Sequence, residues 1–337
     1  MLNDLLSAAA HGALSNWDIK VRNIKLLSQT ENIVFKVVGS KSQSFVLRLH
    51  RPGYHDLKGL LSEQQWTEGL LDAGLDVPVP RATREGQQYA SAFIGKQHRY
   101  VGLLEWADGI PMNNLIESNP STIFIEDSFS LLGEIMARFH NQAVSWDTPP
   151  GFSRHSFDAD GLVGERPFWG RFWESSILTS NQKTYLDILR RHIYSLLVNL
   201  SKDSRIYSLI HADLHPGNIV VEGERLHVID FDDSGFGWHY YDIAVALLNY
   251  HLETSIEHLQ TAMVSGYRKA RSINDEDLSY IPLFMLIRAL VLIGWYSARP
   301  EVEVGATILP QLIRYVRSKG VGVMASHGLL IKPMPGV

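Results

Sequence analysis

Side chains that can handle phosphate and metal concentrate in one stretch of the chain. Asp213 and Asn218 stand five residues apart in the segment His211–Asn218, which reads as a loop, and Asp230 follows. Two carboxylates and an amide oxygen that converge suit Mg²⁺, which prefers hard oxygen ligands and usually shares them with phosphates. One acid then remains to orient a nucleophilic hydroxyl, which is the division of labour that phosphoryl transfer requires.

A short hairpin is expected to bring these residues together. Two apolar runs, Ile219–Val221 and Leu226–Ile229, flank Gly223, a pattern that predicts two strands joined by a turn. The second strand of a hairpin ends near the start of the first. Asp230 is therefore expected beside Asn218.

The rest of the chain divides into two parts with different residue patterns. Up to about Glu105 it predicts strands at 18–27, 33–38, 45–49 and 98–105, and a helix at 56–73 that Gly74 ends. After Glu105, apolar residues recur at steps of three and four, as in amphipathic helices. The helices expected there include one carrying Ile125, Phe129, Leu132, Met136 and Phe139, and others at 182–200, 240–252, 256–271 and 278–297.

Composition bounds the class of protein. The 337 residues are about two average domains, and 45% apolar with 20% charged residues indicates a globular chain. A count of 31 Lys and Arg against 36 Asp and Glu gives a net charge of −5, so nucleic-acid binding lacks its electrostatic driver. There is no cysteine, which excludes disulfides, thiolate metal sites and cysteine nucleophiles.

No segment predicts a membrane or secretory protein. The stretch Met1–Leu14 has no basic cluster before its apolar residues and does not resemble a signal peptide. The longest apolar region, Ile281–Tyr296, is interrupted by Arg288 and is too short to span a bilayer. We expect a cytoplasmic protein that binds neither membrane nor nucleic acid.

Three motifs give the chain a family resemblance. They are His-Ala-Asp-Leu-His-Pro-Gly-Asn at 211–218, Val-Ile-Asp-Phe-Asp-Asp at 228–233 and Tyr-Asp-Ile-Ala at 241–244. Together they are similar to those of the aminoglycoside phosphotransferase family, with its choline-kinase-like, homoserine-kinase-like and stress-response-kinase-like members. The resemblance implies an α+β, two-lobed protein-kinase-like fold. Residues 1–105 would form an N-terminal nucleotide-binding lobe with a small antiparallel sheet. Residues 106–325 would form a mostly helical catalytic and acceptor-binding lobe, and 326–337 a tail.

Carried onto this chain, the resemblance also implies roles. Asp213 would be the catalytic base, or the residue that positions the acceptor hydroxyl, and Asn218 and Asp230 would bind Mg²⁺. His211 would stabilise the catalytic loop, and Asp242 would anchor the backbone of that loop from a following helix. For Asp242 taken alone, a structural role is preferred.

Two neighbours of these residues have other interpretations. Asp232 has no counterpart in the Asp-Phe-Gly motif of protein kinases; it would support the metal site indirectly, and a structural role is preferred. His211, Asp213 and His215 alternate and could instead share a metal, as in a metal-dependent hydrolase. That alternative gives Asn218 no task. We expect His215 to lie near the phosphates or to form a local hydrogen bond.

On the nucleotide side, Val46 and Arg48 share one face of the strand at 45–49 by alternation. By the resemblance, Val46 would touch adenine and Arg48 the phosphates, where the family carries lysine. Arginine is larger and flatter than lysine, so the exchange is not neutral. Lys36 is a substitute cation. Glu63 on the following helix would be the acidic partner of the phosphate-binding cation, and Glu68 is the alternative.

The remaining nucleotide contacts lie in two short segments. The expected phosphate loop, Ser28-Gln29-Thr30-Glu31-Asn32, has no Gly-x-Gly-x-x-Gly pattern, although Ser28 and Thr30 could contact phosphate. The segment Leu104–Ala107 stands where strands give way to helices. Its backbone, at Glu105 and Ala107, would read the adenine edge.

The acceptor is less defined. The aromatic segment Phe168–Glu174 could form a cage for a cationic amine, but we expect most of its rings to pack into the core. Between 150 and 200 there is no acidic run to bind a polycationic antibiotic. The stretch from Asp230 to Asp242 is short and lacks an Ala-Pro-Glu end, which favours a small acceptor.

The sequence therefore predicts a phosphotransferase that uses ATP and Mg²⁺ and moves the γ-phosphate to a hydroxyl of a small molecule. A protein Ser/Thr kinase of the stress-response type is the alternative within this class. A weakly active nucleotide-binding pseudokinase is the alternative outside it, because of Arg48 and the missing glycine-rich loop.

Overall fold

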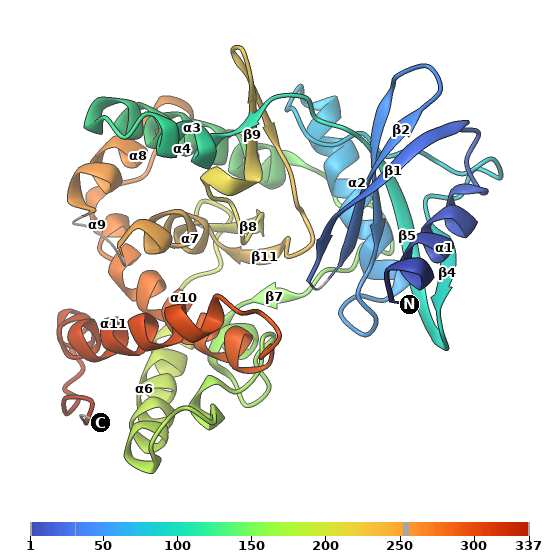
Figure 1. Cartoon of the computed structure of the whole chain (residues 1–337). Coiled ribbons are helices and arrows are strands. Elements are labelled where there is room, and N and C mark those ends of the chain that lie inside the picture. Colours follow the sequence, from blue (N-terminus) through green and yellow to red (C-terminus); the bar gives the residue numbers. More distant parts are fainter. Residues whose placement is uncertain (1, 31, 252–255, 336–337) are drawn as a thin grey trace. The chain divides into compact units, whose positions relative to one another are not determined.

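The computed structural model describes residues 2–30, 32–251 and 256–335, and Figure 1 shows the elements they form. These residues fold into two compact units. The first comprises the chain up to Ile110 with the returning segments 147–153 and 220–229, and the second comprises 111–146, 154–219 and the chain from Asp230 on. The first unit contains all of the segment 1–105 that the sequence suggested for the N-terminal lobe, together with residues 106–110 and the two returning segments.

The first unit is built on a five-stranded antiparallel sheet. Its strands are β1 (Val21–Gln29), β2 (Ile33–Gly39), β3 (Ser44–Leu49), β4 (Ala90–Ile94) and β5 (Gln97–Glu105), in the order β1-β2-β3-β5-β4. Apolar residues of β2, β3 and β5 alternate with others and pack with helix α1 (Leu2–Leu14) and Trp17 into one core. The other face of β2 and β3 carries Lys36, Val46 and Arg48, all half-buried.

Helix α2 (Leu57–Asp72) follows β3 in the same unit. It begins where the Asp56 carboxylate accepts the Gly59 N–H at 2.7 Å, an N-cap that satisfies one otherwise unpaired donor. It ends before Gly74, whose φ of +75° suits glycine. The helix predicted at 56–73 is confirmed. The strands predicted at 18–27, 33–38, 45–49 and 98–105 are also confirmed to within a few residues.

The second unit is mostly helical. Its longer helices are α4 (Thr122–Ser145), α6 (Ser180–Asn199), α7 (His239–His251), α8 (Glu257–Ala270), α10 (Ile281–Ser297) and α11 (Gly305–Ser326), and the short ones are α3 (Met112–Ser118), α5 (Ala159–Val163) and α9 (Asp275–Leu278). A small sheet lies among them, with β8 (Tyr207–Ile210) antiparallel to β11 (Gly235–Trp238) and β7 (Ser156–Phe157) parallel to β11.

Several elements differ from the sequence-based expectation. The helix predicted at 278–297 is broken at Ser279 and Tyr280, so Leu278 ends α9 and α10 starts afresh at Ile281. Leu252, the predicted end of another helix, lies outside the described residues. Strands β4, β8 and β11 were not predicted, because their apolar residues form short, ambiguous runs. Helices α1 and α11 were also not predicted, although their apolar residues recur at helical spacing.

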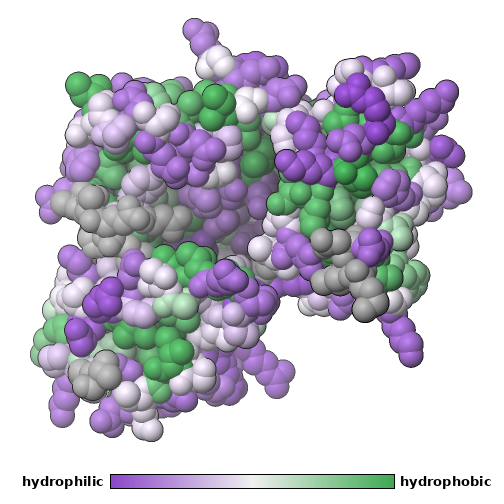
Figure 2. Space-filling view, in the orientation of Figure 1, coloured by the Kyte–Doolittle hydropathy of each residue, from purple (hydrophilic) through white to green (hydrophobic). Residues whose placement is uncertain are grey.

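Helix α10 is the central helix of the second unit. The stretch 275–297 is long and apolar enough to cross a membrane by length and composition, but 67% of its most apolar window is buried inside the protein. It is therefore explained as a core helix. Figure 2 shows hydrophilic residues interspersed with hydrophobic ones over both units on the face in view.

Candidate active site

The loop 211–218 is held from behind by Asp242, in the first turn of α7. Its carboxylate accepts the backbone N–H groups of His211 at 3.1 Å and Ala212 at 2.7 Å, and its side chain is only 1% exposed. Ala212 adopts a φ of +65°, a conformation that is uncommon outside glycine. The anchoring role expected for Asp242 is confirmed.

Asp213 and Asn218 meet inside this loop. The Asn218 amide nitrogen donates to the Asp213 backbone carbonyl at 2.9 Å and lies 3.2 Å from the Asp213 Oδ2. Pro216–Asn218 forms one 3₁₀ turn, which Pro216 starts and which carries Asn218 back toward Asp213. His211 Nδ1 accepts the Asp213 N–H at 3.3 Å, so His211 also stabilises the loop as predicted.

His215 is a local hydrogen-bond partner. Its Nδ1 accepts the Gly217 N–H at 3.0 Å, and its Nε2 lies 3.6 Å from Asp213 Oδ2. Among the described residues, no group of three or more His, Cys, Asp and Glu side chains is placed to hold a metal. The metal-dependent hydrolase alternative, which needs His211, Asp213 and His215 to share an ion, therefore finds no support in this loop.

The other oxygen of Asp213 is taken by a residue that the sequence analysis did not assign to the site. Arg288 of α10 places its Nη2 2.6 Å from Asp213 Oδ1. The Arg288 side chain is 8% exposed and that of Asp213 is 26% exposed, so the arginine lies deeper. Burial acts to raise the pKa of Asp213, but His215, Arg288 and His211 outweigh it and hold that pKa well below its ordinary value. Asp213 is therefore a carboxylate at neutral pH.

Asp230 follows strand β10 (Arg225–Val228), the partner of β9 (Ile219–Glu222), and Gly223 turns between them with a φ of +61°. The predicted hairpin is thus confirmed. Asn218 directly precedes β9, so both residues stand at the same end of the hairpin. Asp230 itself has a φ of +68°, which is unusual for a residue other than glycine.

The segment after Asp230 is clasped by Arg154. The guanidinium donates to the backbone carbonyls of Ser234 at 2.6 Å through Nε and of Asp232 at 2.6 Å through Nη2. Asp232 is buried. Arg154 thus fixes the backbone on which Asp230 depends, and the sequence offered no signal for it.

A buried polar cluster backs Asp242. His140 of α4 donates or accepts at both ring nitrogens, with Nε2 3.2 Å from Asp242 Oδ2 and Nδ1 2.8 Å from the Tyr267 hydroxyl. The ring of His239 stacks on that of His140 at 4.0 Å, and its Nε2 lies 2.9 Å from the Ser208 hydroxyl. Burial lowers the pKa of both histidines well below their ordinary value, so both are neutral.

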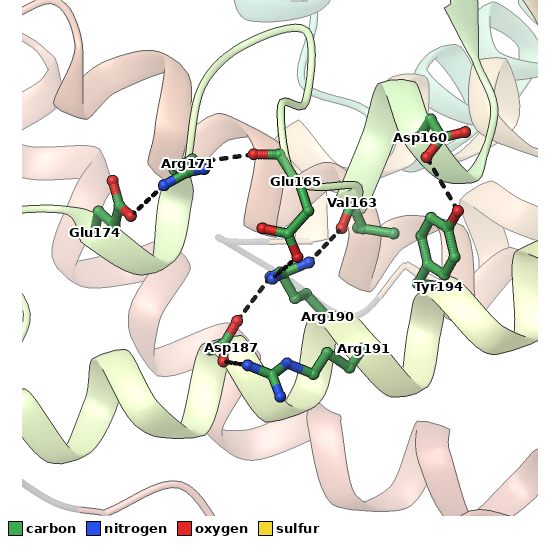
Figure 3. A network of polar contacts seen from close by, with 9 residues as sticks. All are labelled: Asp160, Val163, Glu165, Arg171, Glu174, Asp187, Arg190, Arg191 and Tyr194. Atoms are coloured by element: carbon green, nitrogen blue, oxygen red, sulfur yellow. Dashed lines mark hydrogen bonds and ion pairs between the residues drawn. The ribbon is translucent and has the colours of Figure 1, made fainter.

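The aromatic segment 168–174 packs into the second unit as expected. Trp169, Phe172 and Trp173 are buried, and Phe172–Glu174 forms a 3₁₀ turn. Figure 3 shows that α6 reaches the chain just before this segment, at Glu165, and that Arg171 within the segment donates to the Glu165 carbonyl. Arg190 contacts Glu165 at 2.6 Å and Asp187 at 2.8 Å, and its guanidinium lies over the Trp173 ring.

The remaining contacts of Figure 3 extend this network. Arg171 contacts Glu174 at 2.8 Å and donates to the Glu165 carbonyl, and the Tyr194 hydroxyl donates to Asp160 at 3.0 Å. Arg190 also donates to the Val163 carbonyl, and Arg191 contacts Asp187. The network therefore ties the chain from 160 to 174 to α6 at several points.

The residues predicted for the nucleotide lie in the first unit. Lys36 pairs with Val46 across β2 and β3, and Arg48 pairs with Val34, so the two cations and Val46 share one face. The Lys36 ammonium lies 3.8 Å from the centre of the Trp106 ring, a cation–π contact that fixes its position. The common face is confirmed, and the roles of Val46 and Arg48 toward a nucleotide stay predictions.

The two candidate acids of α2 differ in burial. The Glu63 residue is 8% exposed, whereas Glu68 is exposed and accepts from Gln88. Glu63 is thus not an ordinary surface carboxylate. It remains the preferred candidate for the acidic partner.

In the segments predicted as the hinge and the phosphate loop, several polar groups already have partners within the protein. The Glu105 N–H donates to the Val79 carbonyl at 2.9 Å, so Glu105 could offer an adenine only its carbonyl, and its side chain pairs with Arg81. Ala107 follows β5 and is half-buried. Ser28 lies within β1, where its hydroxyl is 3.4 Å from that of Thr30; Glu31 lies outside the described residues.

Comparison with known proteins agrees with this geometry. Residues 23–273 match the family model described as the Phosphotransferase enzyme family (APH). The amicoumacin kinase of Bacillus subtilis is 24% identical over 294 residues, which cover 84% of this chain and 82% of that protein. A microcompartment-associated aminopropanol kinase superposes with a TM-score of 0.81 and 27% identity, covering 96% of this chain and 99% of that one.

An amicoumacin kinase solved with AMP-PNP and Ca²⁺ superposes with a TM-score of 0.75 and 20% identity, covering 94% of this chain and 93% of that one. The α+β protein-kinase-like fold predicted from the sequence is confirmed by these likenesses and by the antiparallel sheet and helices described above. The comparisons also confirm the family resemblance.

Proposed function

Because the chain belongs to the phosphotransferase enzyme family, we propose that it transfers the γ-phosphate of ATP, bound with Mg²⁺, to a hydroxyl of a small-molecule acceptor. The observation that carries this proposal is the loop 211–218, in which the Asn218 amide lies 3.2 Å from Asp213 Oδ2 while Asp242 holds the backbone. That arrangement places an ionised acid beside a metal-binding amide, as phosphoryl transfer requires.

In the proposed reaction, the acceptor oxygen forms a bond to the γ-phosphorus and the bond from that phosphorus to the bridging oxygen breaks, releasing ADP. The hydroxyl proton passes to Asp213. The low pKa of Asp213 makes it a weak base, which suits a late proton transfer in a loose transition state. Asp213 then contributes chiefly by orienting the hydroxyl.

The oxygen donors of Asn218 and Asp230 fit Mg²⁺, which uses one or two protein ligands together with phosphates and waters. When bound, Mg²⁺ would neutralise charge on the phosphates. Val46, Arg48 and Glu63, with Ser28 and the backbone at Glu105 and Ala107, are proposed to serve the nucleotide. We also propose a cytoplasmic location, which a chain without cysteine fits.

The acceptor is proposed to be a small molecule rather than a protein. The relatives named above carry small-molecule acceptors in their names, amicoumacin and aminopropanol. Only eleven residues lie between Asp230 and Asp242, and four of them form β11, which leaves little chain to dock a protein substrate.

The experiment is ADP release with Mg-ATP and a panel of hydroxylated metabolites that includes 3-aminopropan-1-ol, L-homoserine and choline. We expect Asp230→Asn to weaken Mg-nucleotide binding, and Asp213→Asn to retain binding and lose turnover. Asp203→Asn, at an exposed aspartate paired with Arg205, is the control and should behave as wild type. Equal turnover in all four proteins would refute the assignment, and nucleotide binding without turnover in wild type would favour a pseudokinase.

A further inference from the structure

Arg288 is a charged residue in a place where proteins rarely put one. It is the only charged residue of α10, whose other residues from Ile281 to Ser297 are apolar or small, and its side chain is 8% exposed. Burying a guanidinium requires compensating partners, because its desolvation is expensive. A helix selected for packing alone would carry an apolar residue here.

The guanidinium forms one ion pair, with Asp213, and one hydrogen bond, with Tyr241. Its Nη2 lies 2.6 Å from Asp213 Oδ1, and its Nη1 donates to the Tyr241 hydroxyl at 3.3 Å. The buried Nε has no hydrogen-bond partner. The arginine is therefore not placed to satisfy all of its own donors. Its position is explained by the ion pair with Asp213.

We propose that Arg288 is a positioning residue for phosphoryl transfer: it holds Oδ1 of Asp213 so that Oδ2 is presented to the acceptor hydroxyl. The inference rests on the proposed function of Asp213. It is supported by the division of contacts, since Oδ2 lies 3.2 Å from the Asn218 amide and 3.6 Å from His215 Nε2, on the side of the catalytic loop. Rotation of the carboxylate would break contacts at both oxygens.

The position of the Arg288 guanidinium is itself fixed by packing against aromatic rings. The guanidinium carbon lies 5.4 Å from the centre of the Trp169 ring and 5.9 Å from that of Tyr241, within cation–π range. Gly294 follows Arg288 on the same helix, and a Cβ atom added to Gly294 would lie 2.9 Å from the Gly170 carbonyl oxygen. The helix is therefore in close contact with the turn that carries Trp169. Figure 3 shows that Arg190 of α6 pairs with Glu165, shortly before that turn, and that Arg171, directly after Gly170, donates to the Glu165 carbonyl.

Arg288 also lies outside residues 23–273, the part of the chain that matches the family model. Its role is therefore assigned by the geometry of this protein and not by a family motif. The aromatic rings around Arg288 also limit how the acceptor could bind. Because Trp169 and Tyr241 already face a cation of the protein, they are unsuited to form a cage for a cationic amine.

The test measures kcat and KM in the ADP-release assay, both with 3-aminopropan-1-ol or L-homoserine and with water as acceptor. We expect Arg288→Met to lower kcat by about 100-fold, the scale of a misaligned catalytic group, while the KM for ATP stays within about twofold. Arg288→Lys keeps the charge and should recover part of kcat. Arg299→Met is the control, because Arg299 is a buried arginine near the end of the same helix that lies over Trp295.

The double variant Arg288→Met with Asp213→Asn separates positioning from folding. If Arg288 acts through Asp213, the double variant should be no slower than Asp213→Asn alone. Multiplied losses in the double variant, or a kcat of Arg288→Met near wild type, would overturn the inference while the proposed function stands. Should Arg288→Met fail to fold, Arg288→Lys and a crystal structure of the wild type decide, and a structure without the Arg288–Asp213 contact also overturns it. Wild-type protein that releases no ADP contradicts the proposed function first.

Discussion

At the scale of residues, two uncommon backbone conformations mark the site. Ala212 has a φ of +65° directly before Asp213, and Asp230 has a φ of +68°. A left-handed non-glycine residue costs about 1–3 kcal/mol and persists only where its surroundings over-determine it. At Ala212 those surroundings are visible, because the Asp242 carboxylate accepts the backbone N–H groups of both His211 and Ala212. Asp242 therefore holds the backbone of the loop 211–218 in its uncommon conformation.

The pH dependence of stability should report on Asp242. Burial raises its pKa to about 6, against about 4 in an unfolded chain. A carboxyl with a raised folded pKa contributes stability that is complete below pH 4 and is lost as pH rises through 6. We expect the free energy of unfolding of wild type to gain on the order of 3 kcal/mol, relative to Asp242→Asn, between pH 7 and pH 4.

Urea unfolding of both proteins at several pH values measures this difference. The comparison with Asp242→Asn removes the contributions of all other titrating groups. A difference that does not change with pH would mean that Asp242 titrates normally.

At the scale of elements, the crossing of α4 and α8 supports the loop. A side chain on Gly133 would come within 2.0 Å of the Met263 carbonyl, and one on Gly266 within 1.8 Å of the Ser130 carbonyl. The two helix backbones are thus in direct contact. The same helices carry His140 and Tyr267, which form the hydrogen-bonded cluster behind Asp242. Close approach of the helices therefore sets the position of the loop anchor.

Replacing either glycine should separate the helices. We expect Gly133→Ala or Gly266→Ala to lower the free energy of unfolding by about 2–3 kcal/mol, because no flexible side chain can move out of the way. Gly322→Ala on α11 is the matched control, since it has open space around it and should stabilise that helix by up to about 1 kcal/mol. Thermal unfolding followed by circular dichroism distinguishes the outcomes. Equal melting temperatures for all three variants would contradict the close crossing.

At the scale of the whole molecule, the proposed reaction draws on both compact units. Asp213, Asn218 and Asp230 belong to the second unit, whereas Arg48 and Glu63 belong to the first. Each unit is internally fixed, the first by its five-stranded sheet and the second by the helices around α10. Turnover should therefore be sensitive to substitutions in either unit.

A pair of glutamates on α2 tests the contribution of the first unit. We expect Glu63→Gln to raise the KM for ATP about tenfold, because the proposed acidic partner of the phosphate-binding cation is lost. Glu68→Gln on the exposed side of the same helix should leave KM unchanged. Steady-state ADP release at varied ATP gives both values. If the two variants match, Glu63 has a structural role only.

The sequence alone was sufficient where the signal is local. Alternation placed Val46 and Arg48 on one face, the apolar runs around Gly223 predicted the hairpin, and the motif at 211–218 indicated Asp213 and Asn218. Each of these relations depends on neighbours within a few residues of one another. Helix ends were less accurate, as the break at Ser279 and Tyr280 shows, because the prediction passed over Pro282, a residue favoured in the first turn of a helix, where α10 starts afresh.

Only the tertiary structure decided which distant residues complete the site. Arg288 is 75 residues from Asp213, and its single sequence signal, a charge within an apolar helix, was interpreted only as an argument against a membrane span. Arg154 and Asp232 are 78 residues apart, and His140 and Asp242 are 102 apart. Such pairs form because packing brings their helices and loops together, and no periodicity or motif encodes which buried charge will meet which partner.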